Sequence, residues 1–194
     1  IWTTTPWTLP ANQAVALNAE LDYALIEVKD AHQCHYYLCV EALLNDFVGK
    51  LSLTQYRVVA YCKGQALEGL LLQHPLYDRT VPVILGTHVT TEAGTGAVHT
   101  APAHGLDDYI AAMQYNLPVN HEVLANGCFS DKLPLFGGMH IMKANDAIIE
   151  VLKSNGNLLH QERITHSYPH CWRHKTPVIF RATPQWFISM NAKG

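Results

Sequence analysis

Short runs of branched and aromatic residues, each bounded by turn residues, constrain the fold of this chain more than any other feature. Such runs are typical of β-strands, and they occupy residues 23–28, 34–40, 56–62, 80–86 and 94–102. Helical spacing of apolar residues is found in residues 41–50, 106–116 and 145–158. Because strands and helices do not alternate regularly, a doubly wound parallel sheet is disfavoured. We predict an α+β domain that is mostly β, with a curved or closed barrel-like core and a few flanking helices.

Two of the helical segments carry more specific predictions. Asn145 is a natural N-cap for the segment 145–158, and the Asn155-Gly156 pair is a natural stop. In the segment 106–116, one face is shared by Tyr109, Ile110 and Met113, which is the pattern of an amphipathic helix.

The composition limits what the chain can bind. Of its 194 residues, 48% are hydrophobic, which is enough for a sizeable core, whereas 15% are charged and the formal net charge is −3. Proteins that grip a nucleic-acid duplex by its backbone carry a basic excess, so any nucleic-acid contact is expected to be local. The five cysteines are irregularly spaced, and we find no signal peptide or membrane-length apolar run. These features favour a cytoplasmic location, and the missing initiator methionine leads us to expect a fragment of a longer protein.

The stretch IWTTTPWTLP, residues 1–10, places four threonines around a tryptophan. Branched threonines favour extended backbone, so the run of three predicts an edge strand, although its hydroxyls would lie on both faces. Pro6 is expected to end that strand and to turn the backbone. Thr8 would then approach the same cavity as the three threonines before it. For Trp7, packing in the core is the expected role.

The segment GTGAVHTAPAHGLDDY, residues 94–109, is the densest in chemical groups. Its glycine pair, which includes Gly96, allows a positive φ or a close backbone approach. His99 is expected to face a cavity or solvent, although a lone histidine is more often structural than catalytic. One carboxylate of the pair Asp107 and Asp108 is expected to cap the following helix. The other, kept ionised by the helix dipole, suits an ammonium group.

Several common sites are excluded or weak. The glycine pair lacks the third glycine of a dinucleotide fingerprint and the Gly-Lys-Ser/Thr of a P-loop, and no Gly-x-Ser-x-Gly nucleophile elbow is present. Cys171 and His174 have the spacing of a zinc half-site, but no matching pair lies elsewhere in the chain.

Three long motifs together resemble a known family. WTTTPWTLPAN (residues 2–12), GTGAVHTAPAHGLDDY (94–109) and SYPHCWRHKTPVIFRATPQWF (167–187) are similar to the insertion (connective peptide 1) editing domain of isoleucyl-tRNA synthetases. The resemblance runs along the whole chain. It favours the isoleucyl enzymes over their valyl and leucyl relatives, which begin Thr-Thr-Arg-Pro and carry a different residue at the position of His99.

The resemblance implies hydrolysis of valyl-tRNA(Ile), with valyl-adenylate as a second candidate substrate. By this resemblance, Asp108 matches the family residue that holds the α-ammonium of the substrate. His99 matches the residue that narrows the side-chain pocket so that isoleucine is rejected. The threonine-rich element lines the pocket and binds the 3′-terminal adenosine, and Trp7 and Asn12 lie in the same motif. We assign catalysis to Asp108, Thr4 and Thr5, and substrate binding to Thr3, Trp7, Thr8, Asn12, Gly96, His99 and Asp108.

The resemblance also implies the partners and the boundaries. We expect no metal, no other cofactor and no covalent intermediate, because an aminoacyl ester is already reactive and a positioned water with a stabilised oxyanion suffices. The expected partners are the 3′ CCA end of tRNA(Ile) and the remainder of a synthetase chain, and no membrane. Residues 1–194 are taken as one editing domain, in which residues 163–194 form a return segment toward the catalytic body.

Three alternatives stay open at this point. The chain can be a valyl- or leucyl-type editing domain with another mischarged substrate. It can be a module that binds adenosine or an amino acid without catalysis. It can also be a structural module held by zinc at Cys171 and His174.

Overall fold

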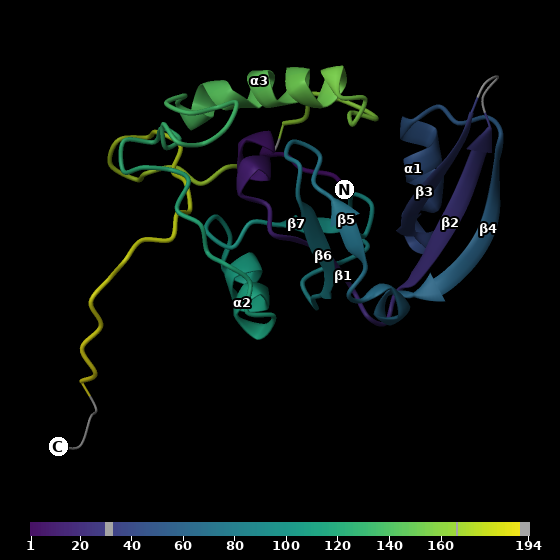
Figure 1. Cartoon of the computed structure of the whole chain (residues 1–194), viewed down its shortest axis with the longest axis horizontal. Helices are drawn as coiled ribbons and strands as arrows, with labels where there is room; N and C mark the ends of the chain where they lie inside the picture. The colour runs from purple at the N-terminus through teal and green to yellow at the C-terminus, as the bar shows by residue number, and fades with distance from the viewer. Residues whose placement is uncertain (30–32, 166, 191–194) are drawn as a thin grey trace.

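The computed structural model describes residues 1–29, 33–165 and 167–190, and its strands form two sheets that lie side by side (Figure 1). The four-stranded sheet has the order β5-β6-β1-β7, with β5 at Leu71–Gln73, β6 at Thr80–Leu85, β1 at Ala14–Leu17 and β7 at Val98–Thr100. The three-stranded sheet has the order β3-β2-β4, with β3 at Cys34–Val40, β2 at Asp22–Lys29 and β4 at Tyr56–Lys63. The α-helices are α1 at Leu44–Lys50, α2 at Leu106–Gln114 and α3 at Ile141–Ser154, and the short 3₁₀ helices are η1 at Pro6–Ala11, η2 at Glu41–Leu43 and η3 at Gly64–Leu67.

The three-stranded sheet agrees closely with its sequence prediction. β2 pairs antiparallel with β3 and β4, and the register shifts at Leu25/Ile26, which indicates a β-bulge or irregularity. α1 packs on this sheet, and the ring centroids of Tyr37 and Phe47 lie 5.9 Å apart. The predicted strands at 23–28, 34–40 and 56–62 are therefore confirmed, as is the helical segment 41–50, which is divided between η2 and α1.

The four-stranded sheet was predicted only in part. β6 confirms the run 80–86, but β7 spans three residues of the predicted run 94–102, because Gly94 and Gly96 have φ values of +87° and +71° and form a turn instead. β1 and β5 were missed, since they are only four and three residues long. β1 lies between β6, with which it pairs parallel, and β7, with which it pairs antiparallel.

The α+β class is confirmed, but a closed barrel is not found among the described residues. The strands form two separate open sheets, and the outer strands β5 and β7 have three residues each, too few for the continuous staggered register of a barrel. The two sheets are joined by hydrogen bonds instead. The Tyr23 hydroxyl donates to the Gly96 carbonyl at 2.6 Å, and the Val40 N–H donates to the Thr95 carbonyl at 2.9 Å.

The start of α3 differs from its prediction. The helix begins at Ile141, and the N-cap is His140, whose Nδ1 accepts a hydrogen bond from the Met142 N–H at 3.2 Å. Asn145 therefore lies within the helix, and its Oδ1 accepts a hydrogen bond from the Trp7 N–H at 2.9 Å. The predicted stop is confirmed, since Asn155 is the C-cap and Gly156 has a φ of +72°.

α2 begins at the predicted residue and ends two residues early, at Gln114, and it does not bury its large apolar face. Tyr109, Ile110 and Met113 remain 42%, 49% and 46% exposed. The buried residues of the helix are Ala111 and Ala112, and Ala111 packs in one core cluster with small residues of β1. Small side chains let the helix approach the sheet closely, which the amphipathic pattern does not reveal.

The segment after α3 has no helix or strand in its described residues up to 190. It runs past the edge of the body and then projects away from it (Figure 1). Its last anchor is Ala182, whose N–H donates to the Ala103 carbonyl at 2.8 Å and whose carbonyl contacts His121 Nδ1 at 3.1 Å. Within the described ranges, we find no helix that is both long and apolar enough to cross a membrane.

Candidate functional site

The threonine run is not a strand. Thr3 Oγ1 accepts a hydrogen bond from the Thr5 N–H at 3.1 Å, and η1 begins at Pro6, a position where proline is favoured because the N–H it lacks has no helical acceptor. The Thr5 carbonyl then accepts hydrogen bonds from both the N–H and the hydroxyl of Thr8, each at 2.9 Å. This turn buries Thr8, which is 6% exposed, and aims its oxygen at β7.

Thr8, Asn12 and His99 form a buried network. Thr8 Oγ1 lies 2.9 Å from His99 Nε2, and Asn12 Nδ2 lies 3.4 Å from His99 Nδ1. Since Thr8 uses its single proton on the Thr5 carbonyl, its oxygen must accept from His99, so Nε2 carries the hydrogen. The unprotonated Nδ1 then accepts from the Asn12 amide. The network therefore assigns a neutral imidazole with one defined tautomer.

His99 is suited to shape a pocket and not to act as a base. It is 8% exposed, and burial lowers its pKa to about 4. Its one basic nitrogen already faces the Asn12 amide, so it has no lone pair free for a substrate or a water. The expectation that His99 faces solvent or an open cavity is not met, because its ring is buried against Thr8 and Asn12; that it walls a substrate pocket stays a prediction.

Asp108 lies in the first turn of α2, close to the end of β7. Its Oδ2 accepts a hydrogen bond from the Ala101 N–H at 2.9 Å, while Oδ1 forms no hydrogen bond with the described residues. The N-cap of α2 is Gly105, so the prediction that one aspartate caps the helix is wrong. Burial raises the pKa of Asp108, and the Ala101 N–H opposes this shift. One carboxylate oxygen thus holds the strand-to-helix turn, and the other is available for a cation.

Two of the remaining predicted residues have clear packing roles. Trp7 is 5% exposed in the core cluster that also contains Phe129 and Ile148, and its ring lies 4.9 Å from that of His104. A Cβ on Gly96 would lie 2.5 Å from Val40 Cβ. The close backbone approach expected at the glycine pair is therefore an approach to β3.

The threonines differ in environment. Thr3 and Thr5 are half-buried with their hydroxyls 3.5 Å apart, whereas Thr4 is exposed and its side chain forms no hydrogen bond with the described residues. The structure therefore brings Thr8, Asn12 and His99 together. Thr3 and Thr5 lie shortly before Thr8 in the chain. Asp108 lies in α2, close to the end of β7, the strand that carries His99.

Two residues that hold this site were missed by the sequence analysis. Asn145 holds the N–H of Trp7, and Arg79 donates from Nη2 to the backbone carbonyl of Asn12. The first pair is 138 positions apart and the second 67, so no local signal marks either residue.

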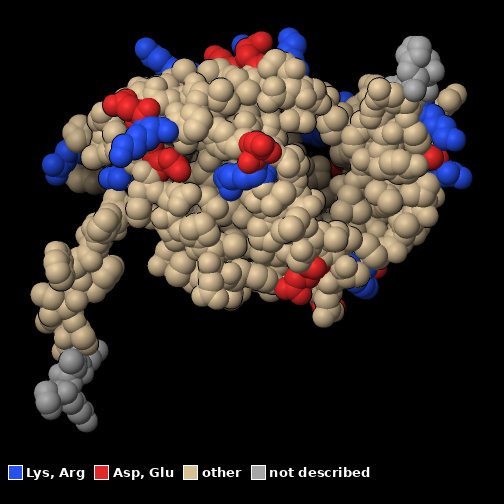
Figure 2. All heavy atoms as spheres, viewed as in Figure 1, with Lys and Arg blue, Asp and Glu red and all other residues tan. Residues whose placement is uncertain are grey.

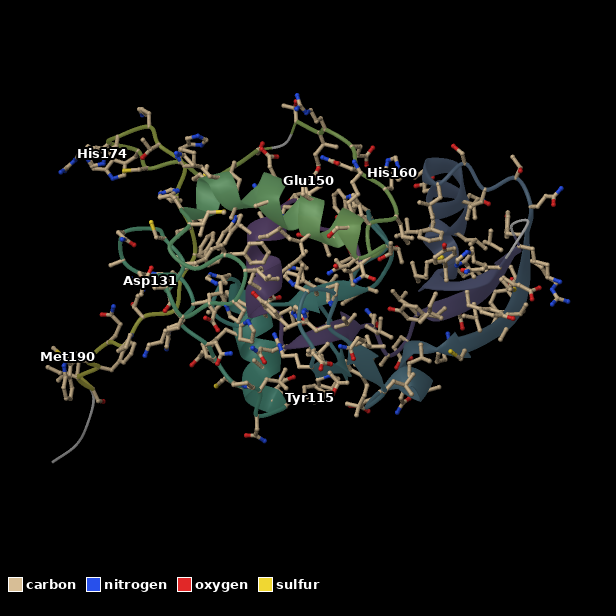
Figure 3. The ribbon with its side chains drawn as sticks, turned by 45° about the horizontal axis from the view of Figure 1, so that its top comes forward. Tyr115, Asp131, Glu150, His160, His174 and Met190 are labelled. Carbon is tan, nitrogen blue, oxygen red and sulfur yellow. The ribbon has the colours of Figure 1, made fainter. Side chains whose placement is uncertain are left out.

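Replacing Asn145 with leucine tests how strongly α3 holds η1. The variant leaves the N–H of Trp7 without its acceptor, so we expect a loss of about 1–3 kcal/mol in the free energy of unfolding. Urea unfolding measures this loss. Glu150→Leu on the exposed side of α3 (Figure 3) is the matched control and should change stability much less. Equal losses in both variants would show that the Asn145 contact is unimportant.

The possible zinc half-site is separate from these residues. Cys171 Sγ lies 3.4 Å from His174 Nδ1. In Figure 3 the loop that carries His174 lies well away from Tyr115, the residue at the carboxyl end of α2. Among the described residues, no group of three or more histidine, cysteine or acidic side chains is arranged to hold a metal ion.

The buried histidines predict how stability depends on pH. Burial lowers the pKa of both His74 and His99 to about 4, from 6.5. The unfolded chain therefore binds protons below about pH 6.5 that the folded chain does not bind until about pH 4, and acid destabilises the fold over this window. Each histidine accounts for roughly 3 kcal/mol across the full window. Urea unfolding at about pH 7 and about pH 5 should show the loss, with smaller losses in His74→Gln and His99→Gln. Equal losses in the wild type and both variants would contradict it.

One family and several relatives match this chain. The family described as leucyl-tRNA synthetase, editing domain, matches residues 11–152. The isoleucine--tRNA ligase of Methylococcus capsulatus is 60% identical over 191 residues, which cover 98% of this chain and 20% of that protein. The isoleucine--tRNA ligase of Nitrosococcus oceani is 57% identical over 194 residues, which cover 100% of this chain and 21% of that protein. The chain thus spans about one fifth of the length of the curated relatives it matches.

Two solved structures have a similar fold. The crystal structure of GlLeuRS-CP1 aligns with a TM-score of 0.63 at 14% identity, covering 84% of this chain and 83% of that one. The P. knowlesi cytosolic leucyl-tRNA synthetase editing domain aligns with a TM-score of 0.55 at 14% identity, covering 79% and 80%. At this identity, the likeness concerns the fold.

Proposed function

This chain belongs to the leucyl-tRNA synthetase editing-domain family, and from that membership we propose that it hydrolyses the ester bond of valyl-tRNA(Ile). The relatives that are 57–60% identical over nearly the whole chain are isoleucine--tRNA ligases, which favours an isoleucine-specific enzyme. Valyl-adenylate is a second substrate of the same proposal. Such a site solves a general problem. A binding pocket distinguishes two side chains that differ by one methylene by only about 1–3 kcal/mol, and isoleucyl-tRNA synthetases are the standard example of this limit.

The observation that carries the proposal is the buried contact of His99 with Thr8 and Asn12. A neutral imidazole held from both nitrogens is a rigid wall. Such a wall can admit the valyl side chain and exclude one that is a methylene longer. The same contact leaves no free base at His99, which suits the hydrolysis of an activated ester by a positioned water.

Asp108 supplies the charge that orients the substrate. In the proposed complex, its Oδ1 accepts from the α-ammonium while Oδ2 keeps its hydrogen bond to the Ala101 N–H. A partly buried, charge-assisted contact of this kind fixes the ester carbonyl relative to the threonines. Thr3, Thr4 and Thr5 are assigned to the 3′-terminal adenosine and to the water. The exposure of Thr4 supports its contact with a ligand.

The proposed partners are the 3′ CCA end of tRNA(Ile) and the remainder of a synthetase. Figure 2 shows a face that is mostly uncharged, with small groups of both signs and no continuous basic surface. This supports a local contact with the tRNA end. The family match ends at residue 152, and the later segment is anchored at Ala182 beside α2, which supports residues 163–194 as a return segment. The five cysteines are free, which suits the proposed cytoplasmic location.

The test is a deacylation assay on three esters. We expect hydrolysis of Val-tRNA(Ile) to exceed that of Ile-tRNA(Ile) and of Thr-tRNA(Val). Faster hydrolysis of either of the other esters would replace the proposed substrate. Saturable binding of a non-hydrolysable valyl-adenosine analogue, with no turnover of any ester, would identify a binding module instead.

A further inference from the structure

A cavity of about 700 Å³ lies beside the carboxyl end of η1, and its lining does not include Thr8, His99 or Asp108. Its walls come from the η1 end, the connection between β5 and β6, and two loops between α2 and α3. It is therefore distinct from the proposed editing site, although η1 contributes to both.

Several polar groups on this cavity have unused hydrogen-bonding capacity. Gln13 is only 7% exposed, yet its side-chain amide forms no hydrogen bond in the described part of the chain. The carboxylate of Glu122 has neither an ion pair nor a hydrogen bond with described residues, and Arg79 uses one Nη2 hydrogen on the Asn12 carbonyl. Since neither amide atom of Gln13 is among the fully buried, unpaired atoms of the described residues, the amide reaches solvent at the cavity and can bond a ligand there.

The charges on the walls select the kind of ligand. Arg79 faces the cavity together with two acidic residues, Asp78 and Glu122. Burial lowers the pKa of Arg79, and the negative charge of the nearby Glu122 opposes this shift. The two opposite charges therefore interact through space without forming an ion pair. The excess of negative charge disfavours a polyanion. Two groups of opposite sign, held apart, match a ligand that carries both an ammonium and a carboxylate.

The rest of the lining is apolar. Leu76 and Leu133 are buried, and Leu135 is 63% exposed at the cavity. This wall suits an aliphatic group. We propose that the cavity binds a small zwitterion with an apolar side chain, of the class of free aliphatic α-amino acids, with its carboxylate at Arg79 and its ammonium at Glu122. The inference does not depend on the proposed function.

The site would be coupled to η1 through one residue. Arg79 donates to the backbone carbonyl of Asn12, and the side chain of Asn12 contacts His99. A ligand on Arg79 therefore lies one residue away from the buried network of Thr8, Asn12 and His99.

Calorimetric titration with L-valine, isobutylamine and isovalerate (3-methylbutanoate) tests the proposal. We expect saturable binding of valine, and at least about tenfold weaker binding of the two analogues, because each lacks one charged contact. Glu122→Gln should weaken valine binding by about tenfold or more. Since the Glu122 side chain has no partner among the described residues, this variant is expected to stay folded.

Two further variants place the binding site. Asp108→Asn should bind valine as the wild type does, and so should Glu150→Gln, the matched exposed control on α3. Loss of valine binding in Asp108→Asn would assign the amino acid to the editing site and overturn the proposal. So would equal affinity of Glu122→Gln and the wild type, equal binding of valine and isobutylamine, or no saturable binding of valine. None of these outcomes depends on ester hydrolysis, so they leave the proposed function to its own assay.

Discussion

Replacing Asp108 with asparagine is expected to reduce hydrolysis of Val-tRNA(Ile) by about 10²-fold or more. The carboxamide keeps an oxygen for the Ala101 N–H, so the turn before α2 is preserved, while the charge that faces the α-ammonium is lost. Breaking one partner of a desolvated charge pair costs about 3–5 kcal/mol. The rate constant for deacylation under single-turnover conditions measures the effect. Because burial raises the pKa of Asp108, we also expect wild-type activity to fall on acidification at a higher pH than for an exposed aspartate.

Asp107→Asn is the matched control for this prediction. Asp107 is the preceding residue in the same helical turn, carries the same charge and is exposed. Its replacement should leave the rate nearly unchanged. If Asp107→Asn is the damaging variant and Asp108→Asn is not, the ammonium anchor lies at Asp107 and the assignment of Asp108 is wrong.

Replacing His99 with alanine is expected to make correctly charged Ile-tRNA(Ile) a substrate. Removing the buried imidazole opens space beside the substrate side chain for at least one more methylene. The discrimination against the isoleucyl ester should then fall by about 10–200-fold, the range that one methylene allows in an apolar pocket. The ratio of the two deacylation rates measures the loss.

His99→Gln serves as the conservative variant. A glutamine amide can still donate to Thr8, so it should preserve more of the discrimination than alanine does. If His99→Ala hydrolyses valyl ester normally and still rejects the isoleucyl ester, His99 is not the residue that excludes isoleucine.

The fold could be predicted where the sequence carries a local signal. β2, β3 and β4 are seven or eight residues long and rich in branched and aromatic residues, and all three were located. β1 and β5 were missed because strands of four and three residues are too short to show a period. The N-cap of α3 was placed five residues late, at Asn145 instead of His140, because Asn145 has the chemistry of an N-cap but uses its oxygen on Trp7.

The candidate site could be predicted in its composition but not in its construction. The motifs identified Thr8, Asn12, His99 and Asp108, and the structure places both Thr8 and Asn12 in contact with His99. The threonine run was expected to be a strand because its side chains are branched, yet Pro6 starts a 3₁₀ helix there. Arg79 and Asn145 hold this helix from distant parts of the chain, and only the tertiary structure reveals such contacts.

The structure of this chain with a bound non-hydrolysable valyl-adenosine analogue would show which residues hold the ammonium, the valyl side chain and the adenosine. We predict that the α-ammonium lies within hydrogen-bonding distance of Asp108 Oδ1, the valyl side chain lies against His99, and the adenosine contacts the Thr3–Thr5 segment. An analogue bound elsewhere, or one whose ammonium is held by another carboxylate while Asp108 contacts only the Ala101 N–H, would contradict the account.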